Sequence, residues 1–388
     1  MVFPTSLREE KLTEEAFSLT TTEDRSTRRG AAPHQWNNPN IKVKFMSRGL
    51  PRGGSAAGFL RQFPGSFPQW GNCLFDFDVD CTDYDWLVVY HDLPRGEGLF
   101  TQEKLHCPRE RTLLITGEPS SITVFGRDYL RQFGCILTFQ EPWAIKHPNV
   151  IYNHPGLMWY YGNPFGEGEY ITWDQMAAAS PPKKTNTIST VCSERTGHGT
   201  LHSARVHFTR QLKSDIPELD IFGHGVKRMV DKAEALDPYM FHIAVENHVY
   251  AHHITEKLPD AFLGHALPFY HGAPNAADYF PKESFIPIDI NNYEKTRDII
   301  ISHLTNNEYT DRLPYIIKAR HRVLEEENLF AILDRKIREQ EGKITTETRG
   351  QVIHKRQSLR VINPLAGIRG LTEKMLTKLY HRIAFKLK

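Results

Sequence analysis

The chain has 388 residues, of which 40% are hydrophobic and 24% are charged. This length predicts two domains of roughly 150 residues each, and the composition is that of a soluble globular protein with enough apolar residues for a large core. The formal net charge of +2 argues against nucleic acid as the main partner. Five widely spaced cysteines include no C-x-x-C pair, which argues against a zinc or redox motif and favours reduced thiols in a cytosolic protein.

The N-terminal residues 1–38 are polar and rich in charged and turn-forming residues, which predicts an arm or a short helix followed by a linker. The first residues are acidic and lack a continuous apolar stretch, so no secretory signal is expected. No part of the sequence approaches the ~18 apolar residues that cross a bilayer. These features favour a cytoplasmic location.

Short apolar segments separated by polar ones follow in residues 39–170. Residues 41–45 alternate between apolar and polar, whereas residues 86–90, 113–115 and 135–137 are continuously apolar, as expected for strands buried on both faces. This spacing predicts a first α/β domain with a parallel sheet.

A second series of strands follows a region rich in glycine and proline at residues 162–184, which we expect to cross between domains. The strands of this series are predicted at residues 187–192, 219–223, 241–245, 266–270 and 285–288. The sequence therefore predicts a second α/β domain over residues 171–350 and a tail over residues 351–388.

An aspartate-rich segment lies between Leu74 and Asp85. Its D-x-D pattern suggests the metal site of some sugar transferases. The alternation of aspartate with Phe75, Phe77 and Val79 also describes an edge strand with one solvated face, which is the favoured interpretation.

The most specific pattern lies between residues 241 and 289. Glu246-Asn247-His248 is followed, after four residues, by His253-Ile254-Thr255-Glu256-Lys257. This block resembles the donor motif of the alpha-1,3/4-fucosyltransferases, glycosyltransferase family 10. Further matching elements occur in the family's order at residues 203–206, 219–223 and 261–289.

Charge explains why such a motif suits a nucleotide sugar. Negative charge grows on a nucleoside diphosphate as it leaves, so cations aimed at it stabilise the transition state. Lys257 offers a compact positive charge, and the planar guanidinium of Arg205 can bind a phosphate through two hydrogen bonds. An ionised Glu256 can accept hydrogen bonds from two ribose hydroxyls. The resemblance implies these same roles, and implies that Glu246, Asn247, His253 and Thr255 also lie at the donor site.

Glu118 is the expected catalytic base. Thr116-Gly117-Glu118 directly follows an apolar strand, at the end of the sheet where open α/β domains bind ligands. The family resembles the chain here, with a glutamate base after a strand, although Pro119 stands where asparagine is common. A helix-capping or surface glutamate is the alternative.

The resemblance implies a GT-B-like fold, with two Rossmann-type domains facing a cleft, and an inverting transfer of L-fucose from GDP-fucose to a galactose- or N-acetylglucosamine-containing glycan. No metal or other cofactor is implied. His248 and His253 depart from the serine and aromatic hydroxyl residue of the family pattern. A transferase using another nucleotide sugar, or a non-catalytic glycan- or nucleotide-binding protein, is therefore the alternative.

Several histidines surround this motif. His248 and His252 have helical spacing, which would suit two metal ligands, but no acidic or cysteine ligand accompanies them in a recognisable pattern. The favoured interpretation is that these histidines form hydrogen bonds within the fold and bind no metal.

The tail contains many cations and only one acid, Glu373, over residues 354–388. Apolar residues recur every three or four positions from Ile368 to Ile383, after a break at Pro364 and Gly367. This pattern predicts a basic amphipathic helix that lies on an anionic membrane surface through residues 364–388, as in bacterial members of the family. A terminal helix packed on the catalytic domain is the alternative. A lipopolysaccharide or capsular acceptor is expected.

Overall fold

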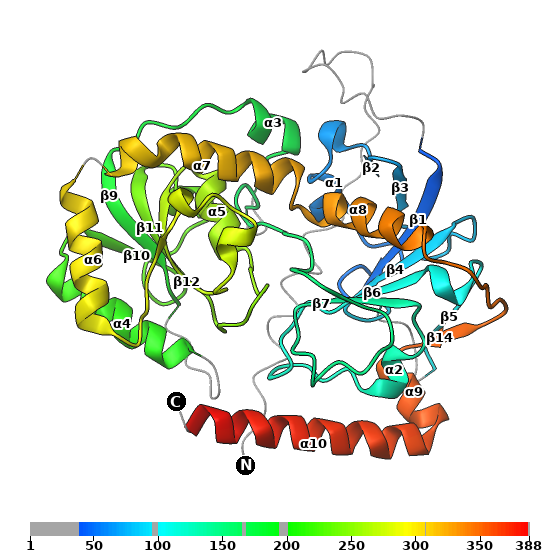
Figure 1. Cartoon of the computed structure of the whole chain (residues 1–388). Coiled ribbons are helices and arrows are strands. Elements are labelled where there is room, and N and C mark those ends of the chain that lie inside the picture. Colours follow the sequence, from blue (N-terminus) through cyan, green and yellow to red (C-terminus); the bar gives the residue numbers. More distant parts are fainter. Residues whose placement is uncertain (1–38, 95–99, 165–167, 194–200, 307, 387–388) are drawn as a thin grey trace.

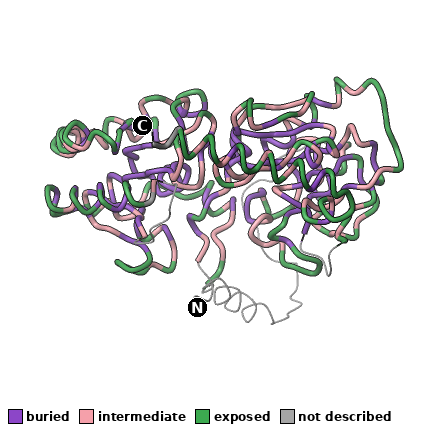
Figure 2. The backbone as a smooth tube through the Cα atoms, turned by 90° about the horizontal axis from the view of Figure 1, so that it is seen from below, coloured by how far each residue is buried: buried purple, intermediate pink, exposed green. Residues whose placement is uncertain are grey.

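The protein is described here by a computed structural model that covers residues 39–94, 100–164, 168–193, 201–306 and 308–386. The predicted N-terminal arm lies outside these residues. The described chain forms two α/β units, each built on a largely parallel sheet (Figure 1), and buried residues gather in the interior of the molecule while exposed ones lie at its surface (Figure 2).

The first sheet has seven strands. In spatial order they are β2 (Gln69–Trp70), β3 (Cys73–Asp76), β1 (Ile41–Ser47), β4 (Trp86–Tyr90), β6 (Thr112–Ile115), β7 (Cys135–Thr138) and β8 (Val150–Tyr152). All neighbouring pairs are parallel except β2 with β3. The four strands predicted from the sequence in this region are present.

The apolar run in β4 shows why this sheet is buried on both faces. Trp86 and Val88 point into one apolar cluster, whereas Leu87 and Val89 point into a second cluster on the opposite face. All four side chains are fully buried. The continuous apolar sequence thus reflects a strand with no solvated face.

The second sheet has five parallel strands. Their order is β10 (Leu219–Phe222), β9 (Asn186–Val191), β11 (Tyr239–Val245), β12 (Leu267–His271) and β13 (Ile286–Pro287). Its main helices are α4 (His202–Asp215), α5 (Lys257–Leu263), α6 (Tyr293–Thr305) and α7 (Glu308–Glu325) (Figure 1). Each strand expected in this region is present.

Helix α8 (Leu329–Glu341) returns to the first sheet, although the sequence assigned residues 171–350 to the second domain. The Phe330 ring lies 4.1 Å from that of Phe63 and 5.0 Å from that of Phe75, centroid to centroid. Asp334 accepts a 2.9 Å hydrogen bond from the Asn72 N–H. Amphipathic periodicity predicts a helix with one buried face, but it does not say which sheet that face covers.

The remaining C-terminal elements also lie on the first domain. Strand β14 (Val352–His354) pairs with β5 (Gln102–Lys104), and α9 (Arg356–Ile362) and α10 (Pro364–Lys386) follow. Gly367 lies inside α10, so the predicted break is confined to the junction at Asn363. Pro364 is tolerated because the first residue of a helix needs no intrahelical N–H bond.

Candidate functional site

The loop between β11 and α5 is braced by a buried carboxylate. Glu246 is fully buried. Its Oε1 accepts a 2.8 Å hydrogen bond from the Thr255 N–H, and its Oε2 accepts one of 2.5 Å from Thr255 Oγ1. The motif residues before α5 are therefore tied to the carboxyl end of β11, where open α/β sheets bind ligands.

Lys257 begins α5 and is surrounded by acceptors. Its Nζ donates to Thr255 Oγ1 at 3.0 Å and to Glu256 Oε1 at 2.9 Å, and lies 3.4 Å from Glu246 Oε2. Burial favours the neutral amine, but Glu246 and Glu256 outweigh it and raise the pKa of Lys257. The side chain therefore keeps a positive charge in a largely dry site.

Glu256 is held ionised by two lysines. Burial alone would raise its pKa, but Lys257 and Lys232 outweigh this and lower it well below the ordinary value. Lys232 Nζ lies 3.7 Å from Glu256 Oε1 and 2.7 Å from Asp260 Oδ2. Sequence reasoning missed Lys232, because it lies in a short 3-10 turn with no motif around it.

Arg205 reaches the same place from α4. The side chain is buried, and its Nη1 donates to Asn247 Oδ1 at 2.9 Å. Its charge also lowers the pKa of Lys257, so the two cations act on each other. A pair of like charges held together in this way suits a dianionic or trianionic ligand, which removes their repulsion on binding.

His253 lies between the two units rather than open to solvent. Its Nδ1 donates to the His248 carbonyl at 3.0 Å, and its ring lies 4.7 Å from that of Phe139, just after β7 of the first sheet. His248 and His252 lie in an irregular loop, so their spacing does not place them on one face of a helix. His252 instead donates its N–H to Asn275 at 2.7 Å.

Glu118 lies just beyond β6, as the sequence predicted for its position in the chain. Its backbone carbonyl accepts a 2.6 Å hydrogen bond from Gln140 Nε2, and its carboxylate accepts one from Thr123 Oγ1. The side chain remains 43% exposed. This carboxylate is thus oriented by its neighbours and still open to a ligand.

Tyr90 lies near both Glu118 and Glu256, a motif residue of the second unit. Burial raises the pKa of the Tyr90 phenol to about 12, and the charges of Tyr160, Glu118 and Glu256 add to the effect. Glu118 belongs to the first unit and Glu256 to the second. Both carboxylates therefore act on one phenol at the end of β4, which brings the two predicted sites together.

His91 is a further residue that sequence reasoning missed. It follows β4, has a left-handed backbone with φ of 71°, and its Nε2 lies 3.8 Å from Glu118 Oε2. Arg356 Nη2 donates to this same Nε2 at 3.4 Å. Burial, together with Arg356 and Arg48, lowers the pKa of His91 against the opposing effects of Glu118 and Asp92. The feature that singles out His91 is its positive φ, which is uncommon for a residue other than glycine. This feature can be seen in the structure but not in the sequence.

The aspartate-rich segment has a local structural role. β3 ends at Asp76 and lies between β2 and β1, so the predicted edge position is wrong, whereas the predicted alternation is present, with Phe75 buried and Asp76 exposed. Asp76 accepts the Asp78 N–H at 2.8 Å and Asp78 accepts the Asp80 N–H at 2.9 Å, which forms successive Asx turns. In the part of the chain that the structure describes, no three side chains of His, Cys, Asp or Glu lie close enough to hold a metal ion.

Comparison with known families decides the nature of the second unit. Residues 181–312 match the C-terminal model of glycosyltransferase family 10 (fucosyltransferase). The second domain belongs to glycosyltransferase family 10. The resemblance seen in the motif is thereby confirmed.

Two curated relatives of this family 10 domain match over short stretches. The alpha-(1,3)-fucosyltransferase FucT of Helicobacter pylori is 36% identical over 93 residues, which cover 24% of this chain and 19% of that protein. The 4-galactosyl-N-acetylglucosaminide 3-alpha-L-fucosyltransferase FUT5 of Gorilla gorilla gorilla is 32% identical over 103 residues, which cover 25% of this chain and 26% of that protein. The chain thus aligns with only a fifth to a quarter of their length.

Solved structures of an alpha1,3-fucosyltransferase are also similar to the chain. One has a TM-score of 0.47 at 16% identity and covers 87% of this chain and 95% of that one. A second, solved with GDP-fucose, has a TM-score of 0.42 at 17% identity and covers 79% of this chain and 95% of that one.

The family 10 domain contains every predicted donor residue, together with Lys232. Those predicted from the sequence are Arg205, Glu246, Asn247, His253, Thr255, Glu256 and Lys257. The structure gathers most of these at the end of β11, but it places His253 against Phe139 of the first unit. Glu118 and His91 lie outside residues 181–312, in the first unit.

Proposed function

We propose that the protein is a glycosyltransferase that moves L-fucose from GDP-fucose to a galactose- or N-acetylglucosamine-containing glycan, in an alpha-1,3-type linkage. The observation that carries this proposal is the convergence of Arg205, Glu256 and Lys257 in a family 10 domain whose curated relatives are named as alpha-1,3-fucosyltransferases. The donor and the linkage follow the relatives' names.

The donor would bind through its diphosphate and ribose. Arg205 and Lys257 supply the positive charge that a leaving diphosphate needs, without a metal ion. Glu256, kept ionised by Lys257 and Lys232, accepts hydrogen bonds from the ribose hydroxyls. Glu246 does not contact the donor in this proposal, because both of its oxygens already hold Thr255.

The reaction would be a single inverting displacement. Glu118 takes the proton of an acceptor hydroxyl, the acceptor oxygen bonds to the anomeric carbon, and the bond from that carbon to the diphosphate oxygen breaks. GDP leaves with the bonding electron pair against Arg205 and Lys257. The partly exposed carboxylate of Glu118, oriented by Thr123, supports this role.

We further propose that α10 rests on the anionic inner face of a cytoplasmic membrane. The helix packs on the first domain through polar side chains and Tyr380. It points an outer stripe of apolar side chains to solvent, each between 52% and 72% exposed: Leu365, Ile368, Leu371, Met375, Leu379 and Ile383. Lys374 and Arg382 are also exposed on this helix. No helix among the described residues is long and apolar enough to cross a membrane.

A basic helix with an exposed apolar stripe suits an interface between lipid and water. The membrane would also bring the enzyme close to a lipid-linked acceptor, such as a lipopolysaccharide or capsular glycan.

A panel of nucleotide sugars tests the proposed function. Purified protein is given each donor with lactose- and N-acetyllactosamine-type acceptors, and release of the nucleoside diphosphate is measured. GDP-fucose should be consumed only with an acceptor present or much faster with it. Turnover with another donor and none with GDP-fucose would reject the fucose assignment while leaving the transferase assignment standing.

The Glu118→Gln variant tests the mechanism. Transfer should fall by about 10²–10⁴-fold, because proton abstraction by a positioned carboxylate contributes that much. GDP affinity should stay within about twofold of the wild-type value, since Glu118 lies outside the diphosphate site. Equal losses of transfer and GDP affinity would contradict the role of base.

A further inference from the structure

Helix α10 contacts the loop that carries Glu118. Lys378 Nζ donates to the Ile122 carbonyl at 3.1 Å and also to the Ser121 carbonyl. Burial lowers the pKa of Lys378, and the negative charge of Glu118 opposes part of this effect. The Lys378 ammonium and the Glu118 carboxylate therefore interact. A lysine of the C-terminal helix thus holds two consecutive carbonyls just beyond the proposed base.

A second contact on the same face of α10 fixes Ser120. The Ser120 hydroxyl donates to Glu141 Oε2 at 2.6 Å and lies 2.8 Å from His381 Nε2. Because the single hydroxyl proton goes to the carboxylate, His381 Nε2 must donate to the Ser120 oxygen. His381 therefore carries its proton on Nε2 and completes a chain from α10 through the loop to Glu141.

An aromatic contact adds to these polar ones. The Trp143 ring lies 4.5 Å from the Tyr380 ring and 5.4 Å from the His381 ring, centroid to centroid. Trp143 and Glu141 belong to the segment after β7, so α10 bridges the segments that follow two neighbouring strands, β6 and β7. Both segments lie at the carboxyl end of the first sheet, where Glu118 is placed.

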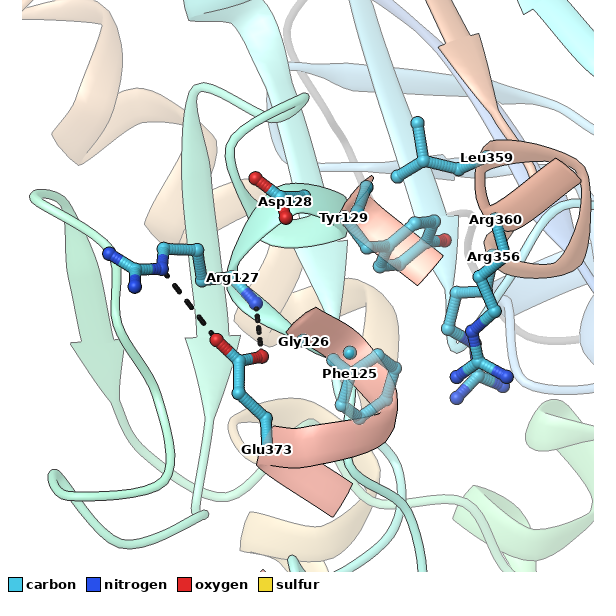
Figure 3. Close-up of a pocket in the computed structure, with 11 residues that line it drawn as sticks. Phe125, Gly126, Arg127, Asp128, Tyr129, Arg356, Leu359, Arg360 and Glu373 are labelled. Carbon is cyan, nitrogen blue, oxygen red and sulfur yellow. Dashed lines mark hydrogen bonds and ion pairs between the residues drawn. The ribbon is translucent and has the colours of Figure 1, made fainter. Parts of the chain in front are cut away.

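The first half of α10 is anchored separately, near α2 (Arg127–Leu130). Glu373 accepts the Arg127 N–H at 2.9 Å and lies 3.6 Å from its guanidinium, over a shallow pocket lined by residues of α2, α9 and α10 (Figure 3). Arg369 pairs with Asp128 at 2.9 Å. The first half of α10 is thus fixed on α2, and its second half contacts the loop that carries Glu118.

We propose that α10 is a positioning element of the active site, in which Lys378 and His381 hold residues 118–123 so that Glu118 faces the donor. This inference rests on the proposed function, but the contact itself can be tested without a substrate. Lys378 and His381 act through the loop and touch neither donor nor acceptor.

Two measurements on Lys378→Met test it, with Lys378→Arg as the rescue variant and Lys318→Met as the control. Lys318 is exposed on α7, away from this loop, so the same substitution there reports the general effect of losing a lysine. Hydrogen exchange of the peptide covering residues 118–123 should become at least about tenfold faster in Lys378→Met, and the arginine variant should restore most of the protection. Unchanged exchange in that peptide would reject the positioning role, whatever the protein catalyses.

The kinetic measurement separates positioning from folding. In Lys378→Met, kcat for transfer to a soluble acceptor should fall by about tenfold to a hundredfold, because a displacement near 1 Å can cost that much. The KM for the donor, GDP affinity and Tm should stay near the wild-type values. Wild-type kcat in this variant, or a parallel loss of GDP affinity, would overturn the inference. If the wild-type protein transfers no fucose, the proposed function fails while the exchange result still decides the contact.

Discussion

Glu246 and Thr255 are joined by two hydrogen bonds, in which both oxygens of one fully buried carboxylate accept from the N–H and hydroxyl of one threonine. This pair fixes the residues that precede Lys257, and it places a negative charge 3.4 Å from the Lys257 ammonium. The stability of the donor loop and the charge of its lysine therefore depend on the same side chain.

The Glu246→Gln substitution should show both effects. It removes one acceptor and the charge, so we expect a loss of about 1–3 kcal/mol in the free energy of unfolding, as for a buried hydrogen bond left unpaired. GDP affinity should fall as well, because Thr255 and Lys257 lose their fixed positions. Urea unfolding and calorimetric titration with GDP measure the two losses. Unchanged values for both would contradict the bracing role.

Lys257 should contribute strongly to nucleotide affinity. A charge-assisted hydrogen bond contributes about 1.5–3 kcal/mol, so Lys257→Met should weaken GDP binding by roughly 10- to 100-fold. Guanosine binding, measured in the same titrations, should change much less because it lacks the diphosphate. A variant that loses affinity for both ligands equally would place Lys257 elsewhere than at the phosphates.

Glu256 makes stability depend on pH in a defined direction. Its pKa in the folded protein lies below the ordinary 4.5 because Lys257 and Lys232 outweigh burial, so the unfolded state binds a proton that the folded state does not. Its contribution is present above pH 4.5 and is lost as the pH falls through the folded pKa. The stability difference between wild type and Glu256→Gln, measured by urea unfolding from pH 7 to pH 3, should shrink only below about pH 4.5. A constant difference across this range would refute the assignment.

The backbone at His91 permits a sharper test than simple deletion of the side chain. With φ at 71°, an alanine at this position keeps a strained left-handed conformation, whereas glycine adopts it freely. We expect His91→Gly to be more stable than His91→Ala by about 1–2 kcal/mol, the reverse of the usual order in regular structure. Thermal unfolding measures this. Both variants should transfer more slowly than wild type, since each loses the imidazole beside Glu118.

The outer stripe of α10 should determine binding to lipid. Replacing Leu371, Met375 and Leu379 by serine removes three side chains that would each gain about 1.5–3 kcal/mol on burial, so sedimentation with anionic vesicles should be lost. Tm should hardly change, because all three are exposed in the folded protein. Wild-type binding to neutral vesicles controls for the electrostatic contribution. Retained sedimentation in the triple variant, or in a chain that ends at residue 363, would reject the membrane proposal.

Much of the fold could be predicted from local pattern. The apolar runs at β4, β6 and β7 are strands because parallel sheets bury both faces, and the motif before α5 could be matched residue by residue. Long-range relationships could not be predicted in this way. The return of α8 to the first sheet, and the approach of Lys232 to Glu256, depend on which surfaces meet in three dimensions, and neither leaves a periodic signal along the chain.

The tail illustrates the same limit. Its periodicity predicted a basic amphipathic helix, either on a membrane surface or packed on the catalytic domain, but it did not show which side chains would contact the first domain. In the structure the polar side contacts the first domain, because Arg369, Glu373, Lys378 and His381 find partners there, and the apolar side faces solvent. His253 likewise belongs to the motif by spacing, yet its ring lies against Phe139, a contact that no spacing could indicate.

The two faces of α10 also set a distance. One helix carries both the outer stripe and the side chains that hold the Glu118 loop, and its diameter with side chains is about 10–12 Å. With the stripe immersed in lipid, the proposed base would stand little more than one helix width above the bilayer. An enzyme held at that height would reach sugars near the lipid anchor and pass over those at the far end of a long chain. Acceptor preference would then depend on how many sugar units separate the modified residue from the membrane.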